Sequence, residues 1–331
     1  MLQLKNATPF AADVTLFPNE QGIDTLYTVV KATFALGKSW TLVEEQLPPQ
    51  AADEYWGEPE DSSIKCPSDF HTGKSATDII MLGEAYAPNQ QPVRQLDVQL
   101  EVGQVRKTLR VIGDRVWNNG EISMPEPFTS MPIVYERAFG GRHDFDDQQC
   151  IVDERNPVGC SFSGKRDVHE MDGLPLPNIE DPSDLIQNFN DNPMPAGFGA
   201  FASSWLPRRQ FAGTYDDAWQ SERAPYLPLD FDSRFLNSAH PDLIYPGYLK
   251  GGEPVYIKNM HPNGDIRVAL PEVNMLCKVN MDDGKVYAPQ MQIESLILDP
   301  NKLQLSLVWK AGFECDKKSL NISEIEVKLS R

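Results

Sequence analysis

Residues 96–112 read LDVQLEVGQVRKTLRVI, and this stretch decides the fold class. Its first half places Leu96, Val98, Leu100 and Val102 on alternate positions, with polar or charged residues between them. A period of two is typical of a β-strand that buries one face. Gly103-Gln104 fits a two-residue hairpin loop, and residues 105–112 fit the return strand. The stretch therefore predicts an antiparallel hairpin.

The same kind of pattern recurs on both sides of this hairpin. Towards the N-terminus, residues 25–36 are rich in β-branched and aromatic side chains. Less regular candidate strands are 77–86 and 133–139. Towards the C-terminus, strands are expected at 255–258, 266–270, 291–298, 303–309 and 325–329, with turn signals at 262–265 and 283–284. We predict a mainly β fold of antiparallel sheets, sandwich-like or partly barrel-like, in two strand-rich blocks at 1–141 and 241–331.

Residues 142–240 break the pattern and form a long irregular segment. Nine prolines lie between Pro157 and Pro228. Two short helices are expected, one near 181–184 with Pro182 at its first position and one starting at Thr214. Large aromatic residues in the second half of the segment argue against disorder, among them Phe198, Phe201, Trp205, Phe211, Tyr215, Trp219, Tyr226 and Phe231. It is therefore either an ordered layer packed on the sheets or a docking surface for a partner.

Charge and cysteine content narrow the classes of partner and compartment. Asp and Glu number 48 against 30 Lys and Arg, a net charge of −18. Such a surface repels nucleic-acid phosphates and anionic lipids, so neither partner is expected. The five cysteines are scattered and odd in number, and the first residues form no signal-peptide core. We expect a cytoplasmic protein.

No set of residues predicts catalysis, a cofactor or a metal site. Residues 159–163 (GCSFS) lack the last glycine of a nucleophile elbow. Residues 197–202 (GFGAFA) match G-x-G-x-x-A but lie between proline-containing peptides, without the strand and helix that a dinucleotide site needs. His143, Cys150, Cys160 and His169 follow no common zinc spacing. A structural metal near Cys150 and Cys160 stays open.

A set of short peptides runs in order along nearly the whole chain: VKATF at 30–34, ATDI at 76–79, YERAFGG at 135–141, NPVG at 156–159, PAGFG at 195–199, AGTYDDAW at 212–219, LPLDFD at 227–232, GGE at 251–253 and LVW at 307–309. Together they resemble a bacterial family first catalogued as a domain of unknown function and encoded beside type VI secretion spike genes. Cys160 and Ser161 depart from the basic residue and glycine expected after NPVG, a difference that concerns the expected loop geometry there and not the resemblance as a whole.

The resemblance implies a non-enzymatic effector adaptor, or loading chaperone. Such proteins hold a toxic effector, often one with a PAAR or Rhs region, and help to mount it on the VgrG spike. The resemblance supplies a role but no binding residues. The alternatives are a hydrolase and a carbohydrate-active or carbohydrate-binding β protein. A deep apolar pocket with converging carboxylates would favour an enzyme, and a flat aromatic face would favour the adaptor.

Tryptophan and arginine are enriched at the centres of protein interfaces. We therefore expect partner contacts at Trp205, Arg208, Arg209 and Trp219 of the central segment, and at Tyr135 and Arg137 of the peptide that leads into it. The alternative is that these are core aromatics and solvated charges. In particular, Glu136 and Arg137 would then form a buried structural pair that anchors the turn at Gly140-Gly141.

Overall fold

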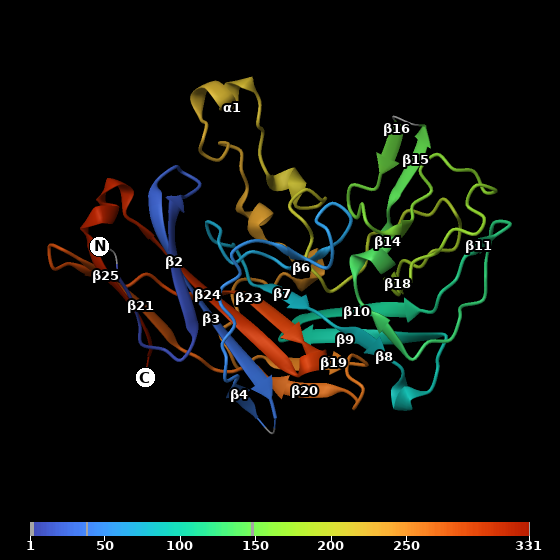
Figure 1. Cartoon of the computed structure of the whole chain (residues 1–331), viewed down its shortest axis with the longest axis horizontal. Helices are drawn as coiled ribbons and strands as arrows, with labels where there is room; N and C mark the ends of the chain where they lie inside the picture. The colour runs from blue at the N-terminus through green and yellow to red at the C-terminus, as the bar shows by residue number, and fades with distance from the viewer. Residues whose placement is uncertain (1–2, 38, 147–148, 331) are drawn as a thin grey trace.

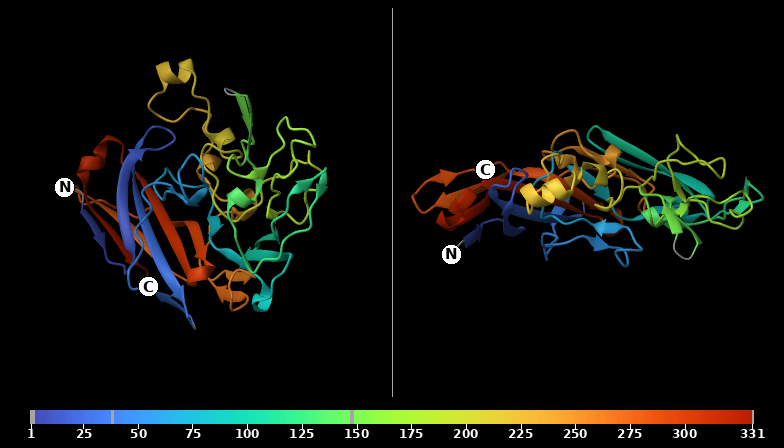
Figure 2. Two further views of the ribbon diagram at one scale, coloured as in Figure 1. Left: turned by 45° about the vertical axis from the view of Figure 1, so that its right-hand side comes forward. Right: turned by 90° about the horizontal axis from the view of Figure 1, so that it is seen from above.

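Three β-sheets form the body of the molecule in the computed structural model, which describes residues 3–37, 39–146 and 149–330. Figures 1 and 2 show them side by side, with a four-stranded sheet at one end. Beyond the five-stranded sheet at the other end lie irregular loops and short strand pairs.

The six-stranded sheet lies in the middle and has the order β2-β3-β24-β23-β7, with β4 paired to β3. Its central strand β3 (Asp24–Leu36) is buried along almost its whole length. A strand covered on both faces needs the near-continuous apolar and β-branched sequence that residues 25–36 supply. The other members are β2 (Ala11–Pro18), β4 (Trp40–Leu42), β7 (Asp78–Met81), β23 (Gln292–Asp299) and β24 (Gln304–Glu314).

The five-stranded sheet contains the hairpin that the sequence predicts. Strand β9 (Gln95–Val102) pairs antiparallel with β10 (Val105–Ile112) in register Val102 to Val105. Gly103 has φ +56° in the loop between them, which glycine adopts without strain. The sheet is completed by β18 (Ile179–Glu180), β19 (Pro254–Lys258) and β20 (Ile266–Ala269).

The four-stranded sheet joins the two ends of the chain. Strand β1 (Gln3–Asn6) runs parallel to β25 (Ile322–Leu329), and β21 (Met275–Met281) and β22 (Val286–Tyr287) follow. Cys277 of β21 lies against Thr28 of β3, with 3.7 Å between Sγ and Oγ1. One continuous hydrophobic core therefore serves this sheet and the six-stranded sheet.

Short elements fill the connections. The paired strands are β5 (Glu54–Tyr55) with β6 (Ile64–Cys66), β8 (Glu84–Tyr86) with β13 (Ser130–Pro132), β11 (Trp117–Asn118) with β12 (Glu121–Ile122), β14 (Phe139–Gly140) with β17 (Cys160–Ser161), and β15 (Arg142–Asp146) with β16 (Gln149–Val152). The helix α1 spans Asp217–Glu222, and 3₁₀ turns span Pro88–Gln90, Tyr135–Arg137, Arg209–Phe211, Ser233–Leu236, Pro241–Leu243, Pro300–Lys302 and Asp316–Asn321.

The prediction of a mainly β, sandwich-like fold with antiparallel sheets is confirmed. Three of the pairings described are parallel, namely β1 with β25, β7 with β23 and β14 with β17. Strands of the two predicted blocks pair with each other in every large sheet, as β3 does with β24 and β9 with β19. The division of the chain at 141 and 240 into separate units stays a prediction.

Three local predictions were wrong. Residues 181–184 form a turn without a helix, in which the Asp181 carboxylate accepts the Ser183 amide. The second helix begins at Asp217 rather than Thr214, because Asp216 caps it by accepting the Trp219 amide while Thr214 bonds Asp230. The expected strand at 133–139 is replaced by a 3₁₀ turn at Tyr135–Arg137 and the two-residue β14.

Candidate functional site

Tyr135 is the point at which three of the characteristic peptides meet. Its ring is buried and packs on Phe201, with ring centroids 4.8 Å apart, and edge-on against Trp205. Its hydroxyl donates to the Gly199 carbonyl at 3.3 Å. Its own carbonyl accepts the Asn156 side-chain amide at 2.8 Å. The peptides at 135–141, 156–159 and 195–199 therefore form one structural unit, and Tyr135 is a core residue.

Asn156 holds the turn that follows Tyr135. It is fully buried, and its Nδ2 also donates to the Phe139 carbonyl at 2.9 Å. Gly140 has φ +143°, and a Cβ there would lie 2.2 Å from the Asn156 carbonyl oxygen. Only glycine accommodates both the conformation and the contact. The Gly140-Gly141 turn is therefore anchored by Asn156.

Glu136 and Arg137 do not form the expected pair. The Glu136 carboxylate accepts the Ser63 amide and hydroxyl at 2.7 and 2.8 Å. Arg137 Nη1 donates to Asn178 Oδ1 at 2.8 Å and lies 3.6 Å from Asp114 Oδ1. The two side chains thus fasten the turn to different neighbouring segments.

A groove of about 630 Å³ opens beside this turn, and we call it the arginine groove. Arg115, Arg137 and Cys160 line it together with the exposed side chains of Val116 and Met124. Behind it, Arg115 is buried and pairs with Glu180, whose second oxygen accepts the Ile186 amide at 2.9 Å. Burial raises the pKa of Glu180 against the opposing effect of Arg115, and burial raises the pKa of the Cys160 thiol to about 12.

Trp205 and Arg208 are packed into the body of the protein. Trp205 is buried in the main core. Arg208 donates to the Phe201 carbonyl at 2.6 Å and the Phe235 carbonyl at 3.0 Å, and its guanidinium lies over the Phe235 ring. Burial lowers the pKa of Arg208 below its usual value. Arg208 also borders a second groove of about 560 Å³ with Phe211, Asn237 and Tyr245, so only its edge is available to a partner.

Trp219 and Arg209 lie nearer the surface. Arg209 is exposed and pairs with Glu154 at 2.6 Å. Trp219 belongs to a projecting segment, residues 212–232, which we call the arm and which carries α1 away from the sheets in Figure 1. Trp219 is half-buried, packs edge-on against Tyr215 at 4.7 Å between ring centroids, and donates to the Tyr226 carbonyl at 2.9 Å. The six predicted contact residues thus lie in different parts of the structure. Tyr135 and Trp205 are buried in the core, and Arg208 is mostly packed against Phe201 and Phe235.

The arm is tied to the body at the turn between β2 and β3. Arg223 Nη2 donates to the Glu20 carbonyl at 2.8 Å. The Tyr226 ring lies 3.2 Å from the place where a Cβ on Gly22 would be. These two contacts attach the arm to the β2–β3 turn and fix the position of its surface.

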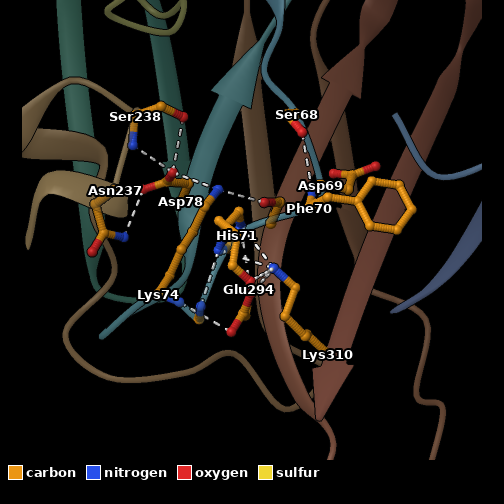
Figure 3. Close-up of polar contacts among 12 residues, drawn as sticks. Ser68, Asp69, Phe70, His71, Lys74, Asp78, Asn237, Ser238, Glu294 and Lys310 are labelled. Carbon is orange, nitrogen blue, oxygen red and sulfur yellow. Dashed lines mark hydrogen bonds and ion pairs between the residues drawn. The ribbon is translucent and has the colours of Figure 1, made fainter. Parts of the chain in front are cut away.

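A buried charge cluster, which sequence reasoning missed, lies on one face of the six-stranded sheet (Figure 3). Its three lysines pair with its three carboxylates: Lys31 with Asp69 at 3.1 Å, Lys74 with Asp78 at 2.8 Å and Lys310 with Glu294 at 3.1 Å. The seventh member is His71, whose ring nitrogens lie 2.9 and 3.0 Å from Lys310 Nζ. A lysine inside an apolar strand, such as Lys31 after Val29-Val30, was the available signal.

The cluster cross-links distant segments. Asp78 of β7 accepts the Ser238 amide at 2.7 Å and Asn237 Nδ2 at 2.9 Å, which fixes the end of the central segment. Asp69 accepts the Gln50 amide at 2.7 Å. Buried ion pairs of this kind are strongly unfavourable to break, because a single remaining charge lacks compensation. We infer that these charges hold loops on the sheet.

Burial dominates the titration of the cluster. It lowers the pKa of Lys310 to about 8 and the pKa of His71 well below its usual value, and Lys310 and Lys74 lower His71 further. It also raises the pKa of Glu294 in spite of both lysines. The neutral imidazole of His71 therefore fits its place beside Lys310.

In the described ranges, no group of three or more His, Cys, Asp or Glu side chains is placed to hold a metal ion. All five cysteines, each within those ranges, are unpaired, and Cys150 is exposed. No helix among the same residues is long and apolar enough to cross a membrane.

Comparison with known proteins identifies one family. Residues 21–310 match a family described as "uncharacterized protein conserved in bacteria" (DUF2169). No curated protein and no solved structure matches the chain. The matched range holds the whole five-stranded sheet, the charge cluster, the arginine groove and the arm, whereas β1, β2 and β25 lie outside it. Because the match covers most of the sequence, the chain belongs to this bacterial DUF2169 family.

Proposed function

We propose that this protein is a non-enzymatic adaptor, or loading chaperone, that binds a type VI secretion effector and helps to load it on the VgrG and PAAR spike. The proposal starts from the resemblance of the ordered peptides to a family encoded beside spike genes. Membership of the DUF2169 family is consistent with it.

The observation that carries the proposal is the arm. Leu229 is 88% exposed and Tyr215 54% exposed, and Tyr226 and Trp219 add further apolar surface. Thr214 is held by Asp230, with 2.7 Å between Oγ1 and Oδ2, so Tyr215 starts from a fixed turn. Exposed aromatic side chains on a fixed backbone lose little conformational entropy on binding and are frequent interface anchors.

The charge of the arm suggests the chemistry of its partner. Residues 212–232 contain five carboxylates and one arginine, a net charge of −4. The carboxylates are Asp216, Asp217, Glu222, Asp230 and Asp232. An acidic, aromatic face is complementary to a segment with basic and apolar side chains. We propose that the bound region of the effector has this composition.

Co-expression with the effector encoded beside this protein tests the function. The adaptor should raise the amount of soluble effector and its secretion, and the two proteins should co-purify. Leu229→Asp and Tyr215→Ala should each lower the co-purified effector by about tenfold, a loss of about 1.4 kcal/mol. Trp56→Ala removes a half-exposed tryptophan from the loop between β5 and β6 and is the matched control.

The adaptor reading fails if the effector is equally soluble and equally secreted without this protein. If the wild-type protein captures the effector and the arm variants capture it equally well, the function stands and the arm is the wrong surface. Circular dichroism of each variant separates loss of binding from loss of fold.

A further inference from the structure

Two guanidinium groups meet at the arginine groove. Arg115 Nη2 donates to the Pro177 carbonyl at 3.2 Å, and Arg137 Nη1 donates to Asn178 Oδ1 at 2.8 Å. The two acceptors belong to consecutive residues. Arg115, which follows β10, and Arg137, which ends the 3₁₀ turn, are therefore close to each other. Both line the same cavity of about 630 Å³.

Arg115 has unused hydrogen-bonding capacity. Its side chain is 8% exposed, and Nη2 makes its bonds to Pro177 and to Glu180. Its buried Nε has no acceptor anywhere in the described part of the chain. A buried donor without a partner is unfavourable, and an acceptor that reaches Nε would remove that penalty.

The carboxylates that line the groove do not accept a hydrogen bond from Arg115 Nε. Glu136 is bound to Ser63, as described above. Asp114 accepts Asn178 Nδ2 at 2.9 Å and is largely exposed at 3.6 Å from Arg137, so a closer anion can replace it there. Asp114 and the exposed Glu126 repel any negative charge in the groove, so a ligand with one negative charge is repelled less than a ligand with two.

The rim of the groove is apolar. Met124 is 70% exposed, and Val116 beside it is also exposed. Leu176, which is buried, and Val134 add apolar surface to the lining. A ligand that fits therefore joins a single negative charge to an apolar body.

We propose that the arginine groove binds a peptide carboxylate that is flanked by apolar side chains, with Arg137 and Arg115 as its hydrogen-bond donors. The charge comes either from a chain terminus or from an Asp or Glu side chain. This site is separate from the arm and does not depend on the adaptor function.

Titration of the full-length protein with three blocked peptides tests the proposal, followed by NMR of the arginine Nε–H signals. The probes are N-acetyl-dileucine with a free carboxylate, its amide, and N-acetyl-leucyl-glutamyl-leucine amide. One or both charged peptides should shift the Arg115 and Arg137 signals, and the neutral amide should not. Whichever charged peptide binds identifies the source of the carboxylate.

Variants test the role of the arginines. Arg137→Gln should weaken binding about tenfold or more, as expected for the loss of a charge-assisted hydrogen bond. Met124→Asp should weaken it through charge at the rim, with no buried group disturbed. Arg106→Gln is the control, since Arg106 is an exposed arginine paired with Glu101.

Three results would overturn the proposal. The first is that neither charged peptide shifts the Arg115 and Arg137 signals at peptide concentrations up to about 10 mM. The second is that the neutral amide binds as tightly as the charged peptides. The third is that the Arg137→Gln variant binds the charged peptides as tightly as the wild type does. None of these results bears on capture of an effector by the arm.

Discussion

The ring of Tyr135 occupies the space that a side chain on Gly197 would need. A Cβ on Gly197 would lie 2.7 Å from Tyr135 Cε1 and 2.8 Å from Cζ. Non-bonded carbon atoms do not approach so closely, and the ring is held between Phe201 and Trp205. The glycine at 197 is therefore required by packing, although its sequence context imitates a nucleotide-binding loop.

Gly197→Ala should destabilise the protein by about 1–3 kcal/mol, because the added methyl group forces Tyr135 out of its position. The midpoint of urea unfolding measures the change. Gly37→Ala is the control, since a Cβ there meets only the Ser39 carbonyl at 3.8 Å. Equal stability of the two variants would contradict this account of the Tyr135 contact.

Asp78→Ala should be far more damaging than removal of a surface carboxylate. It leaves Lys74 buried without its partner and takes away the acceptor of the Ser238 amide, at a cost of about 3–5 kcal/mol. Asp283→Ala breaks an exposed pair with Lys285 and should cost less than about 1 kcal/mol. Chemical denaturation of both variants measures the free energy of unfolding. Similar losses of stability in the two variants would mean that the buried cluster does not stabilise the fold more than a surface ion pair does.

Acidification should destabilise the fold through His71. Its pKa in the folded protein lies well below its ordinary value because of burial, Lys310 and Lys74. On acidification below pH 6.5 the unfolded chain takes up a proton that the folded chain refuses, so the free energy of unfolding falls. Between pH 7.5 and 5.5 this effect amounts to about 1.4 kcal/mol. Glu294 has the opposite sign, because its pKa is raised in the folded protein.

A variant isolates the contribution of His71. Urea unfolding at pH 7.5 and 5.5 should show a smaller loss of stability for His71→Gln than for the wild type. His240, with a pKa lowered to about 4, keeps its own contribution in both proteins. His169→Gln, at an exposed position, should follow the wild type. A His71 variant with the full pH dependence would disprove the assignment.

Thiol reactivity should separate the cysteines by burial. In the native protein at pH 7.5, iodoacetamide should modify Cys150, which is exposed, well before Cys160, whose pKa is raised to about 12. Cys277 is buried, its pKa is raised by burial, and it should also be protected. Mass spectrometry after timed alkylation measures the order, and all sites should react together in urea. Early labelling of Cys160 in the folded protein would show that the arginine groove is more open than its geometry indicates.

Strands with a regular alternation were predictable, because their pattern is local. The hairpin of β9 and β10 and the strands β24 and β25 follow directly from side chains at every second position. The pairing of β3 with β24 had no such signal, since the two strands lie at opposite ends of the chain. Alternation shows which residues form strands but does not identify their partners.

Local pattern also failed where a distant side chain decides the conformation. Residues 133–139 have strand-like composition, yet Asn156 binds the carbonyls of Tyr135 and Phe139 and holds a turn there. The same holds for the candidate sites. Tyr135 and Trp205 were expected to contact a partner, and their burial depends on Phe201 and on contacts that no periodicity reveals. The charge cluster was missed because its members come from four separate stretches of sequence.

The pairing of β3 with β24 has a consequence for biosynthesis. Residues 37–303 separate the two strands, and a ribosome that adds about 5–20 residues per second needs roughly 15–50 s to make them. For most of that time β3 and its neighbour β2 have left the exit tunnel, while the other neighbour, β24, has not yet been made. The nascent chain is thus exposed to misassembly until its last part emerges. A protein proposed to hold another chain therefore itself exposes an unpaired strand edge while it is being made.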